Sequence, residues 1–138
     1  MKKITAAAAM ILMISGASYA QTDTPTFIAM ATSSNQFEIQ SSEMAQDKAE
    51  SEDVKEFASQ MIADHTKAGE ELKAAVEGSG ADAPAEAKMD PKYAEMLQQL
   101  EGAGAGEFDA LYVQLQTTAH EEAVNLFRGY AEAVTRKR

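Results

Sequence analysis

Residues 51–76 read SEDVKEFASQMIADHTKAGEELKAAV, and we expect the rest of the chain to be organised around this stretch. Its apolar residues recur at intervals of three and four positions, at Val54, Phe57, Ala58, Met61, Ile62, Ala68, Leu72, Ala75 and Val76. At about 100° of rotation per residue these positions share one face of a helix, and His65 lies near the middle of that face. The pattern therefore predicts a long amphipathic helix with a titratable ring within its buried face.

The sequence before this stretch predicts another long helix, over residues 24–49. Thr24 is a favourable N-cap and Pro25 suits the first turn, and neither Gly nor Pro follows before residue 51. Its apolar face contains Phe27, Ala31, Ser34, Glu38, Ala45 and Ala49. Glu38 lies at the centre of this face, an unusual place for a carboxylate. Ser51 is predicted to cap the next helix, and so short a connection requires an antiparallel helical hairpin.

Two more helices are expected after the hairpin. Gly78 should end the second helix, and GSGADAPAEAK (78–88) has the composition of a loop. Asp90 followed by Pro91 predicts the start of a short third helix, which the glycine-rich segment GAGAG (102–106) should end.

The last predicted helix extends from about residue 107 to residue 135, with His120 and Gln116 inside or beside its apolar face. The apolar residues of this face are Phe108, Leu111, Tyr112, Leu115, Ala119, Leu126, Phe127, Tyr130, Ala131 and Val134. The first, second and fourth predicted helices are long and the third is short. This arrangement predicts an all-α fold, an antiparallel four-helix bundle.

Residues 1–20, MKKITAAAAMILMISGASYA, have the three-part plan of a secretory signal peptide. Two lysines precede an apolar run, and small residues lead up to Ala20. We expect cleavage between Ala20 and Gln21, export to a bacterial periplasm, and one folded domain over residues 21–138. The apolar run is too short for a spanning helix, which needs about 20 apolar residues, so no stable membrane insertion is expected after cleavage.

The composition argues against several classes of function. The formal net charge of −10 at pH 7 disfavours nucleic acid and anionic membrane surfaces as partners. The chain has no Cys, which excludes disulfides, thiol nucleophiles and cysteine-ligated metal centres. Since nothing in the sequence supplies an oxyanion hole, we expect no enzyme activity. The partner would be an unknown envelope protein or none, and the oligomeric state stays open.

Two long segments resemble one known family. They are FEIQSSEMAQDKAESEDVKEFASQMIADHTKAGEEL (37–72) and GEFDALYVQLQTTAHEEAVNLFRGYA (106–131), with Asp64-His65-Thr66, Phe108-Asp109, Tyr112, His120 and Leu126-Phe127 as their most specific parts. The family comprises exported bacterial proteins, is catalogued as domain of unknown function 4142, and is described as ferritin-like. The resemblance implies a ferritin-like four-helix bundle over nearly all of residues 21–138, and it implies no established activity.

Three polar side chains are expected inside the bundle: Glu38, His65 and His120. If the hairpin turns near Glu50, Glu38 lies 12 residues before the turn and His65 lies 15 residues after it. At about 1.5 Å per residue these two differ in height by only about 4–5 Å. His120 lies near the middle of its own helix and can share this layer.

One interpretation of the layer is structural. Glu38 and His65 would satisfy each other by hydrogen bonding across the hairpin, and Gln116 could join them. On this hypothesis the protein is a non-enzymatic envelope-interaction or stress-related protein and has no cofactor.

The alternative is a periplasmic metal-binding protein. Glu38, His65 and His120 are sufficient for a single Zn ion with an open coordination position, and a Cu ion would also suit imidazole ligands. Met61, one turn before His65, and Asp64 are candidate additional ligands.

A di-iron centre of the ferritin type is not predicted. Such centres use a Glu-x-x-His motif on each of two helices. The residue three positions before His65 is Ile62, and the residue three positions before His120 is Thr117, so neither helix carries the motif.

The signal-peptide prediction can be checked by sequencing the N-terminus of protein recovered from the cell envelope. We expect the mature chain to begin at Gln21, because the small residues before it form the cleavage site. Recovery of membrane-extracted protein that still begins at Met1 would contradict the prediction.

Overall fold

The computed structural model describes residues 22–82 and 88–137. The predicted signal peptide, residues 1–20, and the predicted cleavage site between Ala20 and Gln21 lie outside the described residues. Within the described ranges all regular secondary structure is helical.

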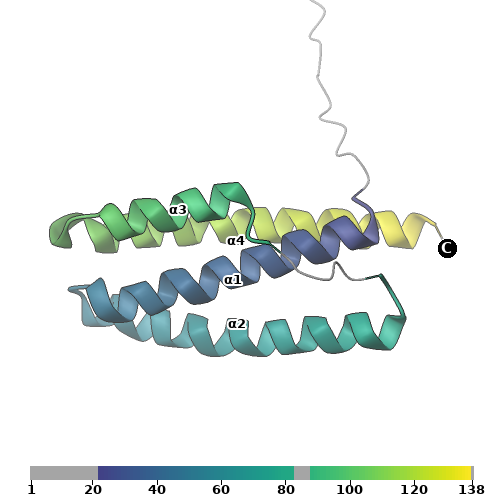
Figure 1. Ribbon diagram of the computed structural model, residues 1–138, viewed down its shortest axis with the longest axis horizontal. Helices are drawn as coiled ribbons and strands as arrows, with labels where there is room; N and C mark the ends of the chain where they lie inside the picture. The colour runs from purple at the N-terminus through teal and green to yellow at the C-terminus, as the bar shows by residue number, and fades with distance from the viewer. Residues whose placement is uncertain (1–21, 83–87, 138) are drawn as a thin grey trace, which may run out of the picture.

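Four helices form the fold: α1 (Thr24–Lys48), α2 (Glu52–Ser79), α3 (Pro91–Gly102) and α4 (Ala105–Arg136). Consecutive helices run in opposite directions (Figure 1). The predicted all-α four-helix bundle with three long helices and a short third one is therefore confirmed. No helix among the described residues combines the length and the apolar character needed to cross a membrane.

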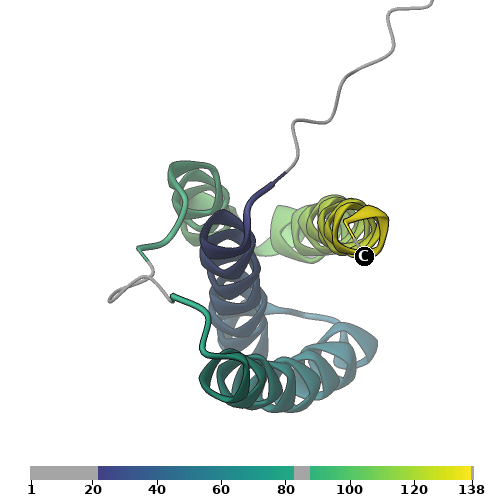
Figure 2. The ribbon, with the colours of Figure 1, turned by 90° about the vertical axis from the view of Figure 1, so that its right-hand side faces the viewer.

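The helix at the centre of the bundle is α1, which packs against each of the other three helices. Figure 2 shows it between α2 on one side and the α3–α4 pair on the other. Ten residues of α1 are buried, whereas α2 buries only Ala58 and Met61. The expectation that the rest of the chain is organised around residues 51–76 was wrong, and Phe57, predicted on the apolar face of that stretch, is 41% exposed. A helix covered on several sides shows weak contrast between its faces, so periodicity alone understates its burial.

Two groups of apolar side chains lie along α1, one at its start and one from Phe37 onward. The larger group includes Phe37, Tyr93, Leu100, Phe108 and Tyr112 from α1, α3 and α4. The smaller group is centred on Phe27, Ile28 and Ala31, with Leu72, Leu126 and Tyr130 packed against it. The ring of Phe27 stacks on that of Tyr130 with centroids 4.0 Å apart. The polar layer thus lies where one apolar group gives way to the other.

The ends of α1 and α2 differ slightly from the predicted ones. Asp23, rather than Thr24, caps α1, and its side chain accepts a hydrogen bond of 2.8 Å from the Thr26 N–H. The second helix continues through Gly78 to Ser79 and is capped by Gly80, whose φ of 65° is left-handed. One glycine inside a helix costs only about 1 kcal/mol, so Gly78 is tolerated, while the left-handed turn requires glycine at the cap.

The ends of α3 and the start of α4 are also set by a capping residue and by glycines. Asp90 caps α3 as predicted, and its side chain accepts a 2.8 Å hydrogen bond from the Lys92 N–H. The segment 102–106 ends α3 as predicted, but α4 begins within it, at Ala105. Two residues are enough for the connection because the two helices are antiparallel neighbours.

Asp109 of α4 holds the turn between α1 and α2. Its carboxylate accepts hydrogen bonds from the Glu50 N–H at 3.1 Å and from the Ser51 N–H at 2.8 Å. Ser51 is the N-cap of α2, as predicted, but its side chain makes no capping hydrogen bond. Asp109 therefore supplies from a distant helix the negative charge and the acceptor that the start of a helix favours.

We expect the Asp109→Ala variant to lower the free energy of unfolding by about 1–3 kcal/mol, because two backbone N–H groups lose their acceptor. Chemical denaturation followed by circular dichroism measures the change. Asp53→Ala is the matched control: Asp53 lies in the first turn of the same helix, but its side chain hydrogen-bonds to no described residue. Equal losses in the two variants would contradict a specific role for the Asp109 hydrogen bonds.

Candidate functional site

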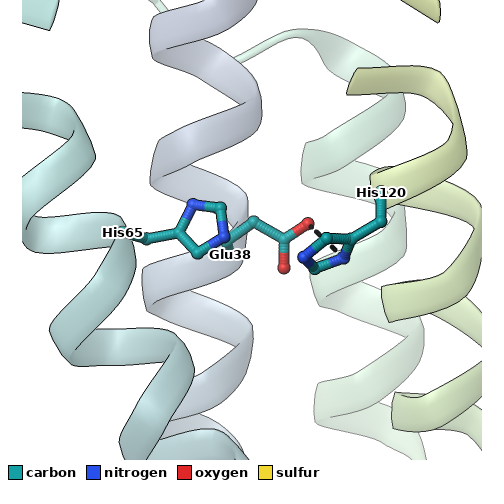
Figure 3. A group of neighbouring side chains, drawn as sticks. All are labelled: Glu38, His65 and His120. Atoms are coloured by element: carbon teal, nitrogen blue, oxygen red, sulfur yellow. Dashed lines mark ion pairs between the residues drawn. The ribbon is translucent and has the colours of Figure 1, made fainter. Parts of the chain in front are cut away.

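Three helices bring Glu38, His65 and His120 to one place. Glu38 belongs to α1, His65 to α2 and His120 to α4. One potential ligand atom from each side chain lies within 4.8 Å of the other two. Figure 3 shows the two imidazole rings on opposite sides of the Glu38 carboxylate. The period of each helix and the length of the hairpin place these residues at a common level.

Glu38 is the enclosed member of the group, with an exposed fraction of only 1%. Its Oε1 atom lies 3.5 Å from Nδ1 of His120, while its Oε2 atom is buried and has no hydrogen-bond partner among the described residues. Burial raises the pKa of Glu38 to about 7, and the nearby His120 and Gln116 side chains act in the opposite direction. The carboxylate therefore has unused capacity to bind a proton or a cation.

His65 is partly buried and makes a hydrogen bond to a side chain of α1. Its Nδ1 atom lies 3.0 Å from Oδ1 of Asn35. An amide oxygen only accepts, so Nδ1 carries the hydrogen and Nε2 keeps a free lone pair. Burial lowers the pKa of His65, the neighbouring His120 lowers it further, and Asp64 partly offsets both effects. A neutral ring with Nε2 free is the form of histidine that binds metals.

His120 also directs Nδ1 at an acceptor, through a different contact. Its Nδ1 atom lies 2.8 Å from the backbone carbonyl oxygen of Gln116, one turn earlier in α4. A carbonyl oxygen also only accepts, so Nδ1 donates and Nε2 is left free. The side chain is 43% exposed, and its ring meets that of His65 edge to face with centroids 5.7 Å apart. The site is therefore closed at Glu38 and accessible at His120.

The two additional candidate ligands lie differently. Asp64 is exposed and does not belong to the group formed by Glu38, His65 and His120. Adjacent residues of a helix point about 100° apart, so Asp64 faces away when His65 faces inward. Met61 is buried on α2, one turn before His65.

Sequence reasoning missed Asn35 as a partner of His65. The available signal was its position, three residues before Glu38 on the same face of α1. The sequence suggested a direct hydrogen bond between Glu38 and His65, but among the described residues none joins them. Gln116 does reach the layer: its Nε2 donates to Ser41 Oγ at 2.9 Å, and its buried Oε1 has no described partner.

The fold and the site define the protein's class: an all-α four-helix bundle with a carboxylate and two histidines at its centre. The chain belongs to the family described as a domain of unknown function (DUF4142), whose model matches residues 13–138. Comparison with curated proteins and with solved structures found no match. The assignment to domain of unknown function 4142, made from residues 37–72 and 106–131, is confirmed.

The raised pKa of Glu38 predicts how stability depends on pH in the presence of a chelator. Because the pKa is raised from 4.5 to about 7, the folded state binds more protons than the unfolded state between these values. The contribution of Glu38 to stability is therefore greatest below pH 4.5 and is lost as the pH rises toward 7.

We expect the free energy of unfolding of wild type, relative to Glu38→Gln, to fall across this window. Denaturant titrations of both proteins at several pH values measure the difference, in which the titration of surface carboxylates largely cancels. Parallel pH profiles for wild type and the variant would contradict the prediction.

Proposed function

We propose that the protein binds a single divalent transition-metal ion, Zn²⁺ or Cu²⁺, through Glu38, His65 and His120. The observation that carries the proposal is the buried Oε2 atom of Glu38, which has no hydrogen-bond partner among the described residues. A buried carboxylate oxygen without a partner is costly, and a cation held beside it would remove the cost. The free Nε2 atoms of the two histidines supply the other ligands.

A purely structural layer fits these contacts less well. Such a layer stabilises the fold when each buried polar atom is paired. Here Glu38 Oε2 and Gln116 Oε1 are both buried without described partners, and His65 pairs with Asn35 instead of Glu38. Both histidines donate through Nδ1 to other acceptors, as metal-ligating histidines usually do.

The ligand types favour Zn²⁺ or Cu²⁺. Two imidazoles and one carboxylate suit Zn²⁺, with a further position open to water on the exposed side of His120. Imidazole also suits Cu²⁺, and Met61 is the candidate soft ligand for copper. We propose a mononuclear site because Ile62 and Thr117 stand where a ferritin-type di-iron centre needs glutamates.

The setting of the site is also part of the proposal. The signal-peptide pattern of residues 1–20 supports export to the periplasm, where the protein would bind metal in the envelope. A carboxylate and histidines inside a four-helix bundle support the ferritin-like relationship. We propose a binding role without catalysis, since N–H groups inside helices are already hydrogen-bonded and do not form an oxyanion hole.

We expect the full chain, freed of metal by chelation, to bind about one equivalent of Zn²⁺ in a calorimetric titration. An ion held by the folded state alone stabilises it by about 2.7 kcal/mol when its free concentration is about 100 times Kd. The melting temperature should therefore rise with Zn²⁺. Glu38→Gln, His65→Ala and His120→Ala should each abolish this rise relative to their own metal-free forms.

Asp64→Ala is the matched control. It removes an exposed carboxylate next to His65 and should leave the Zn²⁺-dependent rise unchanged. This comparison also separates the site from weak binding by the acidic surface of the chain. Absence of binding at micromolar Zn²⁺, or equal binding by wild type and all three ligand variants, would contradict the proposed function.

A further inference from the structure

Asn35 and Gly69 meet beside His65. Asn35 lies on α1, one turn before Glu38, and Gly69 lies on α2, one turn after His65. The Asn35 amide oxygen accepts the 3.0 Å hydrogen bond from Nδ1 of His65. The nitrogen of the same amide points at Gly69, where an added Cβ atom would lie only 2.8 Å from it. Real Cβ atoms essentially never approach another heavy atom so closely.

The backbone does not explain a glycine at position 69. It lies inside a helix, and among the described residues only Gly80 has a positive φ. A glycine inside a helix costs about 1 kcal/mol relative to alanine. What Gly69 provides is space, and the Asn35 amide occupies that space. With a Cβ at position 69 the amide would have to move, and its oxygen is the acceptor that holds His65.

We propose that Asn35 is a positioning residue for the metal site and that Gly69 makes room for it. By accepting from Nδ1, Asn35 fixes the ring of His65 and keeps the hydrogen off Nε2, the atom left for the metal. This inference rests on the proposed function for its metal readout, but the state of His65 can be measured without metal. Groups that orient metal-ligating histidines in this way typically change metal affinity by about 10–100-fold when removed.

His120 provides an internal comparison. Its Nδ1 is held by the backbone carbonyl of Gln116, which no side-chain substitution removes. His65 instead depends on a side chain from another helix. A change at Asn35 should therefore alter His65 and leave His120 as it is, whereas a general loss of structure would alter both.

The experiment records nitrogen NMR spectra of the histidine side chains in the full chain, with chelator, at the same mildly alkaline pH for every variant. In wild type we expect both histidines to carry the hydrogen on Nδ1. In Asn35→Ala the hydrogen of His65 should redistribute toward Nε2, and His120 should not change. Asn35→Asp keeps an acceptor oxygen at the same place and should restore the wild-type state of His65.

Gly69→Ala should change His65 in the same direction as Asn35→Ala. Its matched control is Gly78→Ala, a glycine of the same helix where an added Cβ meets nothing within 4 Å. The control should leave the His65 spectrum unchanged. If Gly69→Ala also leaves it unchanged, Gly69 has no part in placing Asn35.

Zn²⁺ titrations of the same variants complete the test. We expect Kd to rise by about 10–100-fold in Asn35→Ala and to recover in Asn35→Asp. An unchanged His65 spectrum in Asn35→Ala, or a changed spectrum with unchanged Zn²⁺ affinity, would overturn the positioning role. If the spectrum changes as expected but wild type binds no Zn²⁺, the proposed function fails while the placement of His65 by Asn35 stands.

Discussion

Glu38 places a carboxylate inside the bundle, on the helix that packs against all the others. Apolar side chains lie before and after it along α1, and the exposed fraction of Glu38 is only 1%. Small polar residues on the same helix, among them Ser34, Ser41 and Ser42, are buried as well. A buried charge without a partner is energetically costly. Both histidines lie beside this carboxylate, so their positions matter because it needs a partner.

Polar contacts add to apolar packing in determining how α2 lies on α1. Only Ala58 and Met61 of α2 are buried, so the apolar surface alone specifies its register weakly. The Asp109 carboxylate holds the start of the helix, and the contact between Asn35 and His65 holds its middle. Hydrogen bonds require particular atoms at particular distances, and they can set a register that apolar contact leaves loose. The site and the packing of α2 therefore depend on some of the same atoms.

The residues that carry the resemblance to the family have two different roles in the structure. Phe108 fills the core, Asp109 caps the hairpin, and the Tyr112 hydroxyl lies 2.8 Å from Ser42 Oγ. These contacts serve the fold. His65 and His120 instead face a carboxylate that their hydrogen bonds leave unsatisfied, and this difference separates residues that hold the bundle together from residues that can bind a ligand.

Caps, glycines and periodicity in the sequence predicted the four helices, and the short connection at Ser51 predicted the antiparallel hairpin. Periodicity also predicted the inward direction of Glu38, His65 and His120, because the face of a residue depends only on the fixed rotation per residue within its own helix. The tertiary structure decided that α1 is the central helix, that Asp109 caps α2, and that Asn35 takes the hydrogen bond expected of Glu38. These outcomes depend on how far each helix is rotated and shifted against its neighbours. The rotation and shift of each helix depend on contacts between residues far apart in the chain, and a local sequence pattern does not contain this information.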